Sequence, residues 1–186
     1  AGLYKLGSKS ALITSVSDDA VGRFCVNKLK HYGVDTQYVR SVAGECRTSL
    51  AVYESCTNDF QNVIYRNNAA DFQVNAEDMD QVEYSNFSAI ISAGTVFASE
   101  PSRAATFRAF ETAHNAGLPI IFDIDYRPYS WPSPGIASDV LSRAGEKSDL
   151  IVGNDEEFGF MAGGIEKGLG KARELAAKGK LVIYKK

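Results

Sequence analysis

Histidine and cysteine are scarce in this sequence of 186 residues, which holds two histidines and three cysteines. With only His31 and His114 available, a Ser-His-Asp triad or a histidine-rich metal site has little material. The cysteines are odd in number and lack the spacing of metal ligands, so we expect reduced thiols in a cytoplasmic protein. Acid–base chemistry would therefore fall to carboxylates.

A basic excess and long apolar runs are missing as well. The net charge of −3 predicts no nucleic-acid partner, because the faces that bind nucleic acid are usually basic. No apolar run approaches the ~20 residues of a membrane span, and the opening AGLYKLGSKS lacks the apolar core of a secretory signal. We expect one domain, without a membrane partner, whose 45% hydrophobic content suffices for a core.

What the sequence does contain is a series of short apolar runs separated by segments with helical spacing. The expected strands are residues 11–16, 89–91, 118–122, 150–152 and 181–184. The expected helices are residues 21–31, 101–115, 138–143 and 168–178. Strands that alternate with helices of this length predict an α/β fold with a mostly parallel sheet and helices on both faces.

Two β-rich runs, TSLAVYES (48–55) and QNVIYR (61–66), interrupt this alternation. They are joined by the polar loop CTNDF, which has the length of a hairpin connection. A hairpin over about residues 46–68 either pairs at the sheet edge or leaves the sheet as a flap over a ligand. The residues leave both possibilities open.

Arg66 ends the second of these runs, in YRNNAAD. An arginine on an edge strand is often only a solvated charge. Here Asn68 and Asp71 follow closely, and they give the end of the hairpin a dense set of hydrogen-bonding groups. If the hairpin is a flap, this end would reach a sugar or a sugar acid beneath it.

Charged residues follow the apolar run 118–121, in FDIDYRPYSWPSP. Asp123, Asp125 and Arg127 alternate, so in an extended chain they project from the same side. Polar groups also follow the neighbouring strands, in SAGTVFASEPS and in NDEE. Because ligands of open α/β sheets bind outside the carboxyl ends of the strands, these ends predict a crevice. The alternative is that Arg127 pairs with one of the aspartates and only braces the strand end.

Two further segments have competing interpretations. Asn154 and Glu157 are either a plain helix N-cap with an acidic first turn, or a support for magnesium-bound phosphate through water. The run GLGK at residues 168–171 suggests a phosphate loop, but the pattern requires glycine where Ile165 stands and serine or threonine where Ala172 stands. We interpret that run as a loop and helix start.

At these residues the sequence resembles the ribokinase-like (PfkB-type) sugar kinases. SKSALITSVSDDAVGRF resembles an early strand and Asp-containing loop of the family, with Ser17 where glycine is usual. TSLAVYES and NVIYRNNAAD resemble its β lid, FDIDYRPYSW its Asp-x-(Asn/Asp)-x-Arg…Trp stretch, and GNDEEF its Asn-x-x-Glu motif. The likeness is greatest to members that phosphorylate sugar acids, and favours 5-dehydro-2-deoxygluconate of inositol breakdown.

The resemblance implies transfer of the γ-phosphoryl group of ATP, with Mg²⁺, to a sugar hydroxyl. By position, a substrate-binding set and an ATP- and magnesium-binding set follow, with Glu157 meeting the metal through water. The substrate set is Arg66, Asn68, Asp125 and Arg127, and the nucleotide set is Asn154 and Glu157. The family's Gly-Gly sugar loop would precede Ala1 and its catalytic aspartate would lie beyond Lys186, so we interpret the chain as the central part of a kinase.

Other substrates, a non-catalytic function and a dimer contact remain open at this point. The same chemistry would serve 2-keto-3-deoxygluconate or fructose, although a pair of arginines favours an acid, because guanidinium binds carboxylate in a bidentate fork. A chain without its catalytic aspartate is alternatively a non-catalytic sugar-binding domain. A lid hairpin with apolar residues on both strands could also pair with the lid of a second subunit.

Overall fold

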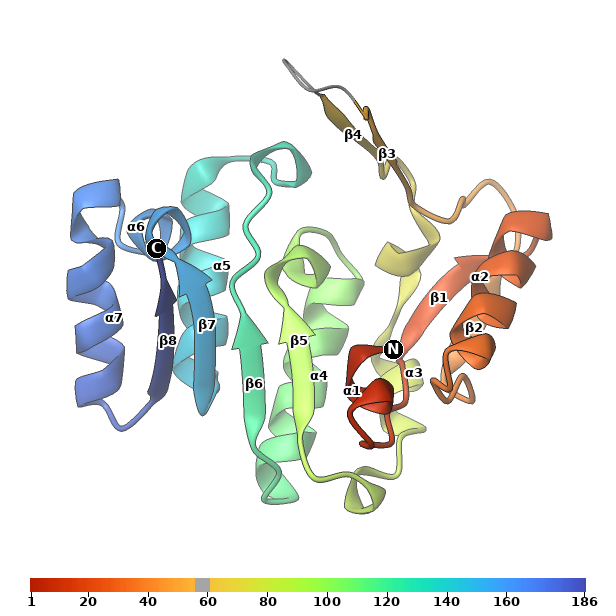
Figure 1. Ribbon diagram of the computed structural model, residues 1–186, viewed down its shortest axis with the longest axis horizontal. Coiled ribbons are helices and arrows are strands. Elements are labelled where there is room, and N and C mark those ends of the chain that lie inside the picture. Colours follow the sequence, from red (N-terminus) through yellow and green to blue (C-terminus); the bar gives the residue numbers. More distant parts are fainter. Residues whose placement is uncertain (56–60) are drawn as a thin grey trace. The chain divides into compact units, whose positions relative to one another are not determined.

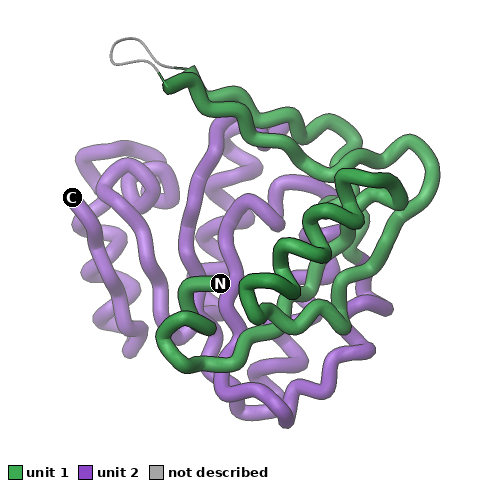
Figure 2. The backbone as a smooth tube through the Cα atoms, turned by 45° about the vertical axis from the view of Figure 1, so that its right-hand side comes forward, with its two compact units in different colours: residues 1–74 green, residues 75–186 purple. Residues whose placement is uncertain are grey.

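The computed structural model describes residues 1–55 and 61–186, which divide into two compact units, residues 1–74 and 75–186 (Figure 2). The expected hairpin loop CTNDF, including Cys56, lies outside the described residues. The assignment of residues 1–186 to a single partial kinase domain stays a prediction.

Unit 1 is built around two short parallel strands and a hairpin (Figure 1). Its elements are α1 (Gly2–Lys5), β1 (Thr14–Ser17), α2 (Ala20–His31), β2 (Val39–Val42), β3 (Leu50–Tyr53), β4 (Asn62–Tyr65) and the 3-10 helix η1 (Ala70–Gln73).

Unit 2 alternates strands with helices, as the sequence predicts (Figure 1). Its elements are α3 (Ala76–Asp80), η2 (Tyr84–Asn86), β5 (Ile90–Ala93), η3 (Gly94–Phe97), α4 (Ser102–Asn115), β6 (Ile120–Asp123), η4 (Pro128–Ser130), α5 (Pro134–Lys147), β7 (Leu150–Asn154), α6 (Asp155–Met161), η5 (Ile165–Lys167), α7 (Gly168–Ala177) and β8 (Leu181–Lys185).

In unit 1, β1 pairs with β2 in parallel, and α2 connects them. Asp19 caps α2, because its carboxylate accepts hydrogen bonds from the backbone N–H groups of Val21 and Gly22. Gly22 is required for this packing: a Cβ there would lie 1.9 Å from the carbonyl oxygen of Ser17. Helix and strand therefore meet backbone to backbone at the carboxyl end of β1.

The hairpin forms as the sequence predicts. β3 and β4 pair antiparallel, with Leu50 opposite Tyr65 and Val52 opposite Val63. Among the described residues they pair only with each other, and the two strands extend away from β1 and β2 (Figure 1). The structure thus favours the alternative in which the hairpin leaves the sheet. Its action as a lid over a ligand stays a prediction.

The four strands of unit 2 form one parallel sheet in the order β5-β6-β7-β8. Strands that follow one another in this way through right-handed crossovers place all their helices on the same face. Side chains on that face, such as Phe122 and Ile151, are fully buried, whereas Ile91, Leu181 and Ile183 are about half exposed. The connecting helices of unit 2 therefore cover one face of its four-stranded sheet.

The core of unit 2 lies between this face and the helices. Phe97 is fully buried, and its ring contacts Phe110 and Phe122 edge-on with centroids 5.6 and 5.9 Å apart. Such aromatic contacts contribute beyond their burial of area. Gly94 allows a close approach, because a Cβ there would lie 2.0 Å from the carbonyl oxygen of Ile124. The chain after β5 is thereby held against the chain after β6.

Several boundaries differ from those expected. The first strand begins at Thr14, and Ala11 contributes only an isolated bridge to Asp35. β2 was not predicted, because VRSV is short and carries charge in a partly exposed strand. The helix expected at residues 138–143 runs from Pro134 to Lys147, capped by Ser133. Pro134 stands at its first position, where the missing N–H costs nothing.

Candidate functional site

The end of β6 does not stay extended as far as the sequence suggested. The N–H of Ile124 still donates to the carbonyl of Val152, but Asp125 has a φ of +36°. The prediction that Asp123, Asp125 and Arg127 project from the same side of an extended strand is therefore wrong beyond β6. A bend at Asp125 turns the following residues out of the sheet.

Asp125 and Asn68 share an uncommon backbone conformation. They are the two non-glycine residues with positive φ within residues 1–55 and 61–186, at +36° and +47°. Asp and Asn tolerate this region better than most residues, but it still carries strain. Strained positions concentrate at functional sites. The sequence singled out both residues for substrate binding, one in each unit.

Arg127 is ion-paired at the end of β6. Its Nη2 lies 2.6 Å from Oδ1 of Asp125, and its Nη1 donates to the carbonyl of Tyr126 at 2.9 Å. The same Nη1 lies 4.0 Å from Oε1 of Glu157. The side chain is 44% exposed, so the pair with Asp125 is open to solvent and to exchange with another carboxylate.

Asn154 and Glu157 form a capping box at the start of α6. The Asn154 side chain accepts from the N–H of Glu157, and the Glu157 carboxylate accepts from the N–H of Asn154, both at 2.8 Å. Glu157 is buried, and this bond uses only its Oε2. Asn154 and Glu157 therefore form the helix N-cap that was one of the two interpretations. The other oxygen of Glu157, Oε1, lies on the side of Arg127.

A cavity of about 660 Å³ opens beside these residues, within unit 2. It is lined by the loop after β6, the start of α5, α6 and the segment that follows α6. Its polar lining includes Arg127, Asn154 and Glu157. The structure thus brings three of the predicted site residues to one cavity at the carboxyl edge of β6 and β7, and joins Asp125 to them through Arg127.

The cavity wall also contains a stacked aromatic pair. The rings of Tyr126 and Phe160 lie 3.7 Å apart at 20°. Burial raises the pKa of the Tyr126 phenol above its ordinary value. We did not predict these two residues. The position of Tyr126 between Asp125 and Arg127 was the one signal in the sequence that Tyr126 belongs to the site. The bend at Asp125 is what turns the Tyr126 ring toward α6.

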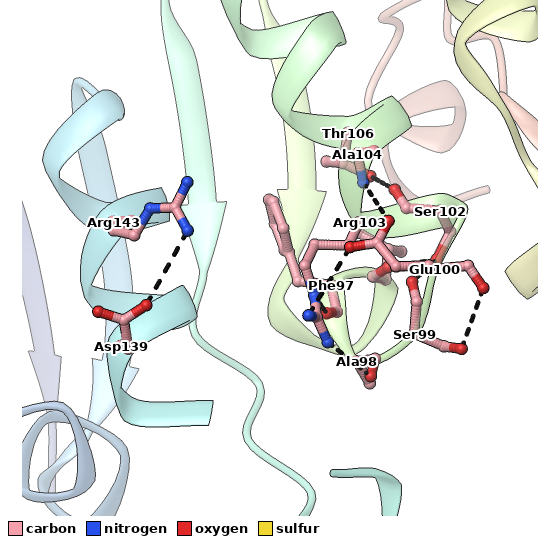
Figure 3. Close-up of polar contacts among 11 residues, drawn as sticks. Phe97, Ala98, Ser99, Glu100, Ser102, Arg103, Ala104, Thr106, Asp139 and Arg143 are labelled. Carbon is pink, nitrogen blue, oxygen red and sulfur yellow. Dashed lines mark hydrogen bonds and ion pairs between the residues drawn. The ribbon is translucent and has the colours of Figure 1, made fainter. Parts of the chain in front are cut away.

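The polar residues after β5 do not join this cavity. Arg103 donates to the carbonyls of Phe97 and Ala98 (Figure 3). Ser102 donates to the carbonyls of Val96 and Ser99. The Glu100 carboxylate accepts from the N–H of Ala104. These side chains hold the turn into α4, so the crevice predicted at three strand ends forms at the ends of β6 and β7.

A second cavity of about 660 Å³ lies along α4 and α5. Its charges are balanced by local pairs, Arg103 with Glu100 at 3.7 Å and Arg143 with Asp139 at 3.9 Å (Figure 3). None of the predicted site residues lines it. We therefore take the cavity beside α6 as the candidate site of unit 2.

The predicted site residues of unit 1 lie at the base of the hairpin. Arg66 donates from both Nε and Nη2 to Oδ2 of Asp71, and its guanidinium lies 4.1 Å above the Phe72 ring. Oδ1 of Asn68 accepts from the Cys46 thiol at 3.6 Å. Arg66 is therefore not the solvated charge that an edge strand usually carries, since its side chain is only 17% exposed.

A divalent cation in the cavity of unit 2 would be held mainly through water. Among residues 1–55 and 61–186, no group of three or more His, Cys, Asp or Glu side chains forms a protein cage for a metal. Mg²⁺ commonly keeps several waters and takes one or two carboxylates together with substrate phosphates. Oε1 of the buried Glu157 is the oxygen that such an ion or its water would meet.

No helix in the described part of the chain is long and apolar enough to cross a membrane. Residues 1–186 match the pfkB family of carbohydrate kinases. A 5-dehydro-2-deoxygluconokinase of Geobacillus kaustophilus (strain HTA426) is 37% identical over 161 residues, or 86% of this chain and 48% of the relative. The chain thus spans about half the length of the curated relatives that it matches.

Solved structures share the fold. The PfkB protein of Polaromonas sp. JS666 aligns with a TM-score of 0.89 at 23% identity, covering 99% of this chain and 63% of that one. A fructokinase of Vibrio cholerae O395, in its fructose-, ADP- and calcium-bound form, aligns with a TM-score of 0.76 at 25% identity, covering 93% of this chain and 56% of that one. With the family match over residues 1–186, the α/β topology and the polar strand ends, the chain belongs to the pfkB family of carbohydrate kinases.

Proposed function

We propose that the protein containing these residues phosphorylates a sugar acid with ATP, and that the acid is 5-dehydro-2-deoxygluconate. The observation that carries the proposal is the convergence of Arg127, Asn154 and Glu157 on one cavity at the carboxyl edge of the sheet. The 37% identity to a 5-dehydro-2-deoxygluconokinase supports the choice of substrate.

Phosphoryl transfer asks a protein mainly to position the reactants and to stabilise charge on the transferring group. Arg127 would bind the substrate carboxylate in exchange for part of its contact with Asp125, because both carboxylates would bind the same guanidinium group. Asn154 and Glu157 would hold the nucleotide end, and a magnesium ion bound there would neutralise phosphate charge. The Vibrio cholerae fructokinase with ADP and calcium supports a nucleotide and a divalent cation.

Arg66 would contact the acid from the hairpin, which would act as a lid that excludes water from the reaction. In this proposal an aspartate serves as the catalytic base and takes the proton of the sugar hydroxyl. A non-catalytic sugar-binding protein is the alternative of another class, and it would bind the acid without consuming ATP.

We also propose that the hairpin pairs with that of a second subunit. Leu50, Val52, Val63 and Tyr65 lie on one face of the hairpin, because directly opposed residues and alternate residues share a face. Each of these side chains is between 42% and 59% exposed. Apolar side chains gathered in this way on an exposed two-stranded sheet favour association.

The substrate proposal is tested with the full-length protein, ATP and Mg²⁺. We expect kcat/KM to be highest for 5-dehydro-2-deoxygluconate among a panel that includes 2-keto-3-deoxygluconate, fructose and ribose. Faster turnover of a neutral sugar than of either acid would refute the acid substrate. Tight binding of an acid by calorimetry, without ADP release, would favour the non-catalytic alternative.

A further inference from the structure

The base of the hairpin contains a carboxylate that contacts both of its strands. Oδ2 of Asp71 accepts from Arg66, which directly follows β4, and Oδ1 accepts from the Ser49 hydroxyl at 2.6 Å. Ser49 directly precedes β3. Ser49 and Arg66 are thus the chain neighbours of Leu50 and Tyr65, the last opposed pair of the hairpin. Asp71 therefore joins the two strands one position beyond their last backbone-paired residues.

Asp71 itself stands on a well-anchored segment of unit 1. The N–H of Ala70 donates to the carbonyl of Arg47 at 2.8 Å, and Arg40 donates to the carbonyl of Gln73 at 2.7 Å. Ala69 and Ala70 are almost fully buried. The carboxylate thus has a fixed position, to which a hairpin with mostly exposed side chains is attached.

The pair with Arg66 is shielded from solvent. The side chains of Arg66 and Asp71 are 17% and 24% exposed, and the Phe72 ring covers one face of the guanidinium. Salt screens such a pair less than an exposed one. Two nitrogens of the guanidinium bind the same carboxylate oxygen, so the plane of the guanidinium is set by Asp71 and Phe72 together.

We propose that Asp71 is a positioning residue, which fixes the hairpin base and orients the Arg66 guanidinium for recognition of a carboxylate. This inference rests on the proposed function in so far as Arg66 binds the acid. Asp71 touches neither substrate nor nucleotide in this role. It acts through Arg66, and it leaves the chemistry of phosphoryl transfer to other residues.

Asp71→Asn separates the two contacts of the carboxylate. The amide oxygen can still accept from Ser49, but the amide nitrogen is a donor and repels the donors of Arg66. Ser49→Ala is the matched control, because it removes the contact with the other strand and leaves Asp71 and Arg66 in place. Either variant is made in the full-length protein, and circular dichroism confirms that it folds.

The measurement is kcat/KM for the sugar acid and for its neutral alcohol analogue. We expect Asp71→Asn to lower the ratio of acid to neutral substrate about 10-fold, because a charge-assisted hydrogen bond loses its orientation. Ser49→Ala should leave the ratio within about 2-fold. In an Arg66→Ala background Asp71→Asn should have no further effect on the ratio, because Asp71 acts through Arg66.

Equal losses for both substrates in Asp71→Asn would overturn the proposal, as would a further loss of the ratio in the Arg66→Ala background. No acid preference in the wild type would instead refute the proposed substrate. Hydrogen exchange still tests Asp71 in that case: faster exchange at residues 50–53 and 62–65 in Asp71→Asn supports the positioning of the hairpin base, and unchanged exchange overturns it. If Asp71→Asn fails to fold, Asp71→Glu, which keeps the charge but displaces the carboxylate from Arg66, is measured for the same exchange, with the same two outcomes.

Discussion

Each unit of the chain holds an arginine that the sequence assigns to substrate binding, and the two arginines are held in different ways. Arg66 is 17% exposed, covered by an aromatic ring and bound through two nitrogens to Asp71 at the base of a hairpin. Arg127 is 44% exposed, bound to Asp125, and borders a cavity at the carboxyl end of a sheet.

The difference indicates which arginine can exchange its partner. A carboxylate ligand has to compete with the resident aspartate, and the competition is easier where water already reaches the pair. Asp125 sits on strained backbone at the open edge of the sheet, whereas Asp71 also binds Ser49 and belongs to a buried segment. We therefore expect Arg127 to give up part of its contact with Asp125 when it binds the acid, and Arg66 to keep its contact with Asp71 while it contacts the acid.

The largest effect is expected at Arg127. In the full-length protein Arg127→Ala should lower kcat/KM for the sugar acid by about 10- to 150-fold, because charge-assisted hydrogen bonds contribute about 1.5–3 kcal/mol. Arg127→Lys should recover only part of this loss, since lysine keeps the charge but loses the bidentate fork.

The control for Arg127→Ala is the neutral alcohol analogue of the acid. If the substitution lowers kcat/KM equally for both substrates, Arg127 braces the strand end and does not bind the carboxylate. Asp125→Asn separates the two roles further. It removes the resident charge, so a carboxylate-binding Arg127 should gain affinity for the acid, and a bracing Arg127 should not.

The second largest effect is expected on dimerisation through the hairpin. Val52 points to the apolar face shared with Val63, and Ala51 points to the opposite face. If that face pairs with a second subunit, Val52→Lys should weaken dimerisation by at least about 10-fold, because a charge would be buried without a partner. Analytical ultracentrifugation measures this directly.

Ala51→Lys is the matched control, because it adds the same charge one residue away on the other face. It should leave the dimer intact. A monomeric wild type at micromolar concentration would refute the dimer proposal, and equal weakening by both substitutions would show that charge on the hairpin, whichever its face, disturbs association.

The sequence predicted those parts of the fold that local pattern determines. Apolar runs such as 118–122 predicted the parallel strands, and the two β-rich runs predicted the hairpin. The hydrophobic periodicity and the length of a run are enough to specify these elements. β2 was missed, since its residues VRSV are neither apolar nor clearly alternating. The covering of only one sheet face in unit 2 depends on the order of the strands, which no local pattern contains.

The candidate site was predicted in its residue types and only partly in its geometry. Asn154 and Glu157 lie where the motif placed them, because a capping box is a local structure. The bend at Asp125 could not be predicted from the sequence. Because of this bend, Arg127 and Tyr126 turn toward α6. The partner of Arg66 lies five residues further along the chain, in a 3-10 helix whose position only tertiary packing fixes.

The smallest effect concerns the helix starts of the two units. In unit 1 the cap of α2 is a carboxylate, and hydrogen bonds from the Gly22 N–H and the Ser17 hydroxyl hold the pKa of Asp19 below its ordinary value of 3.8. In unit 2 the cap of α6 is the neutral Asn154 amide, supported by Glu157. The start of α2 should therefore be the more sensitive to protonation of its cap.

A lowered folded-state pKa means that the unfolded chain takes up the proton first as the pH falls. The stabilisation by Asp19 is then fully present above about pH 4, near the ordinary value, and is lost as the pH falls through the lower folded value. Asp19→Asn keeps an acceptor for the cap but cannot titrate. Thermal unfolding of the two proteins should differ most near neutral pH, and the difference should shrink below about pH 4. Asp18→Asn removes the same charge from an exposed neighbour, and an equal pH dependence in that variant would show that net charge, and not the cap, is responsible.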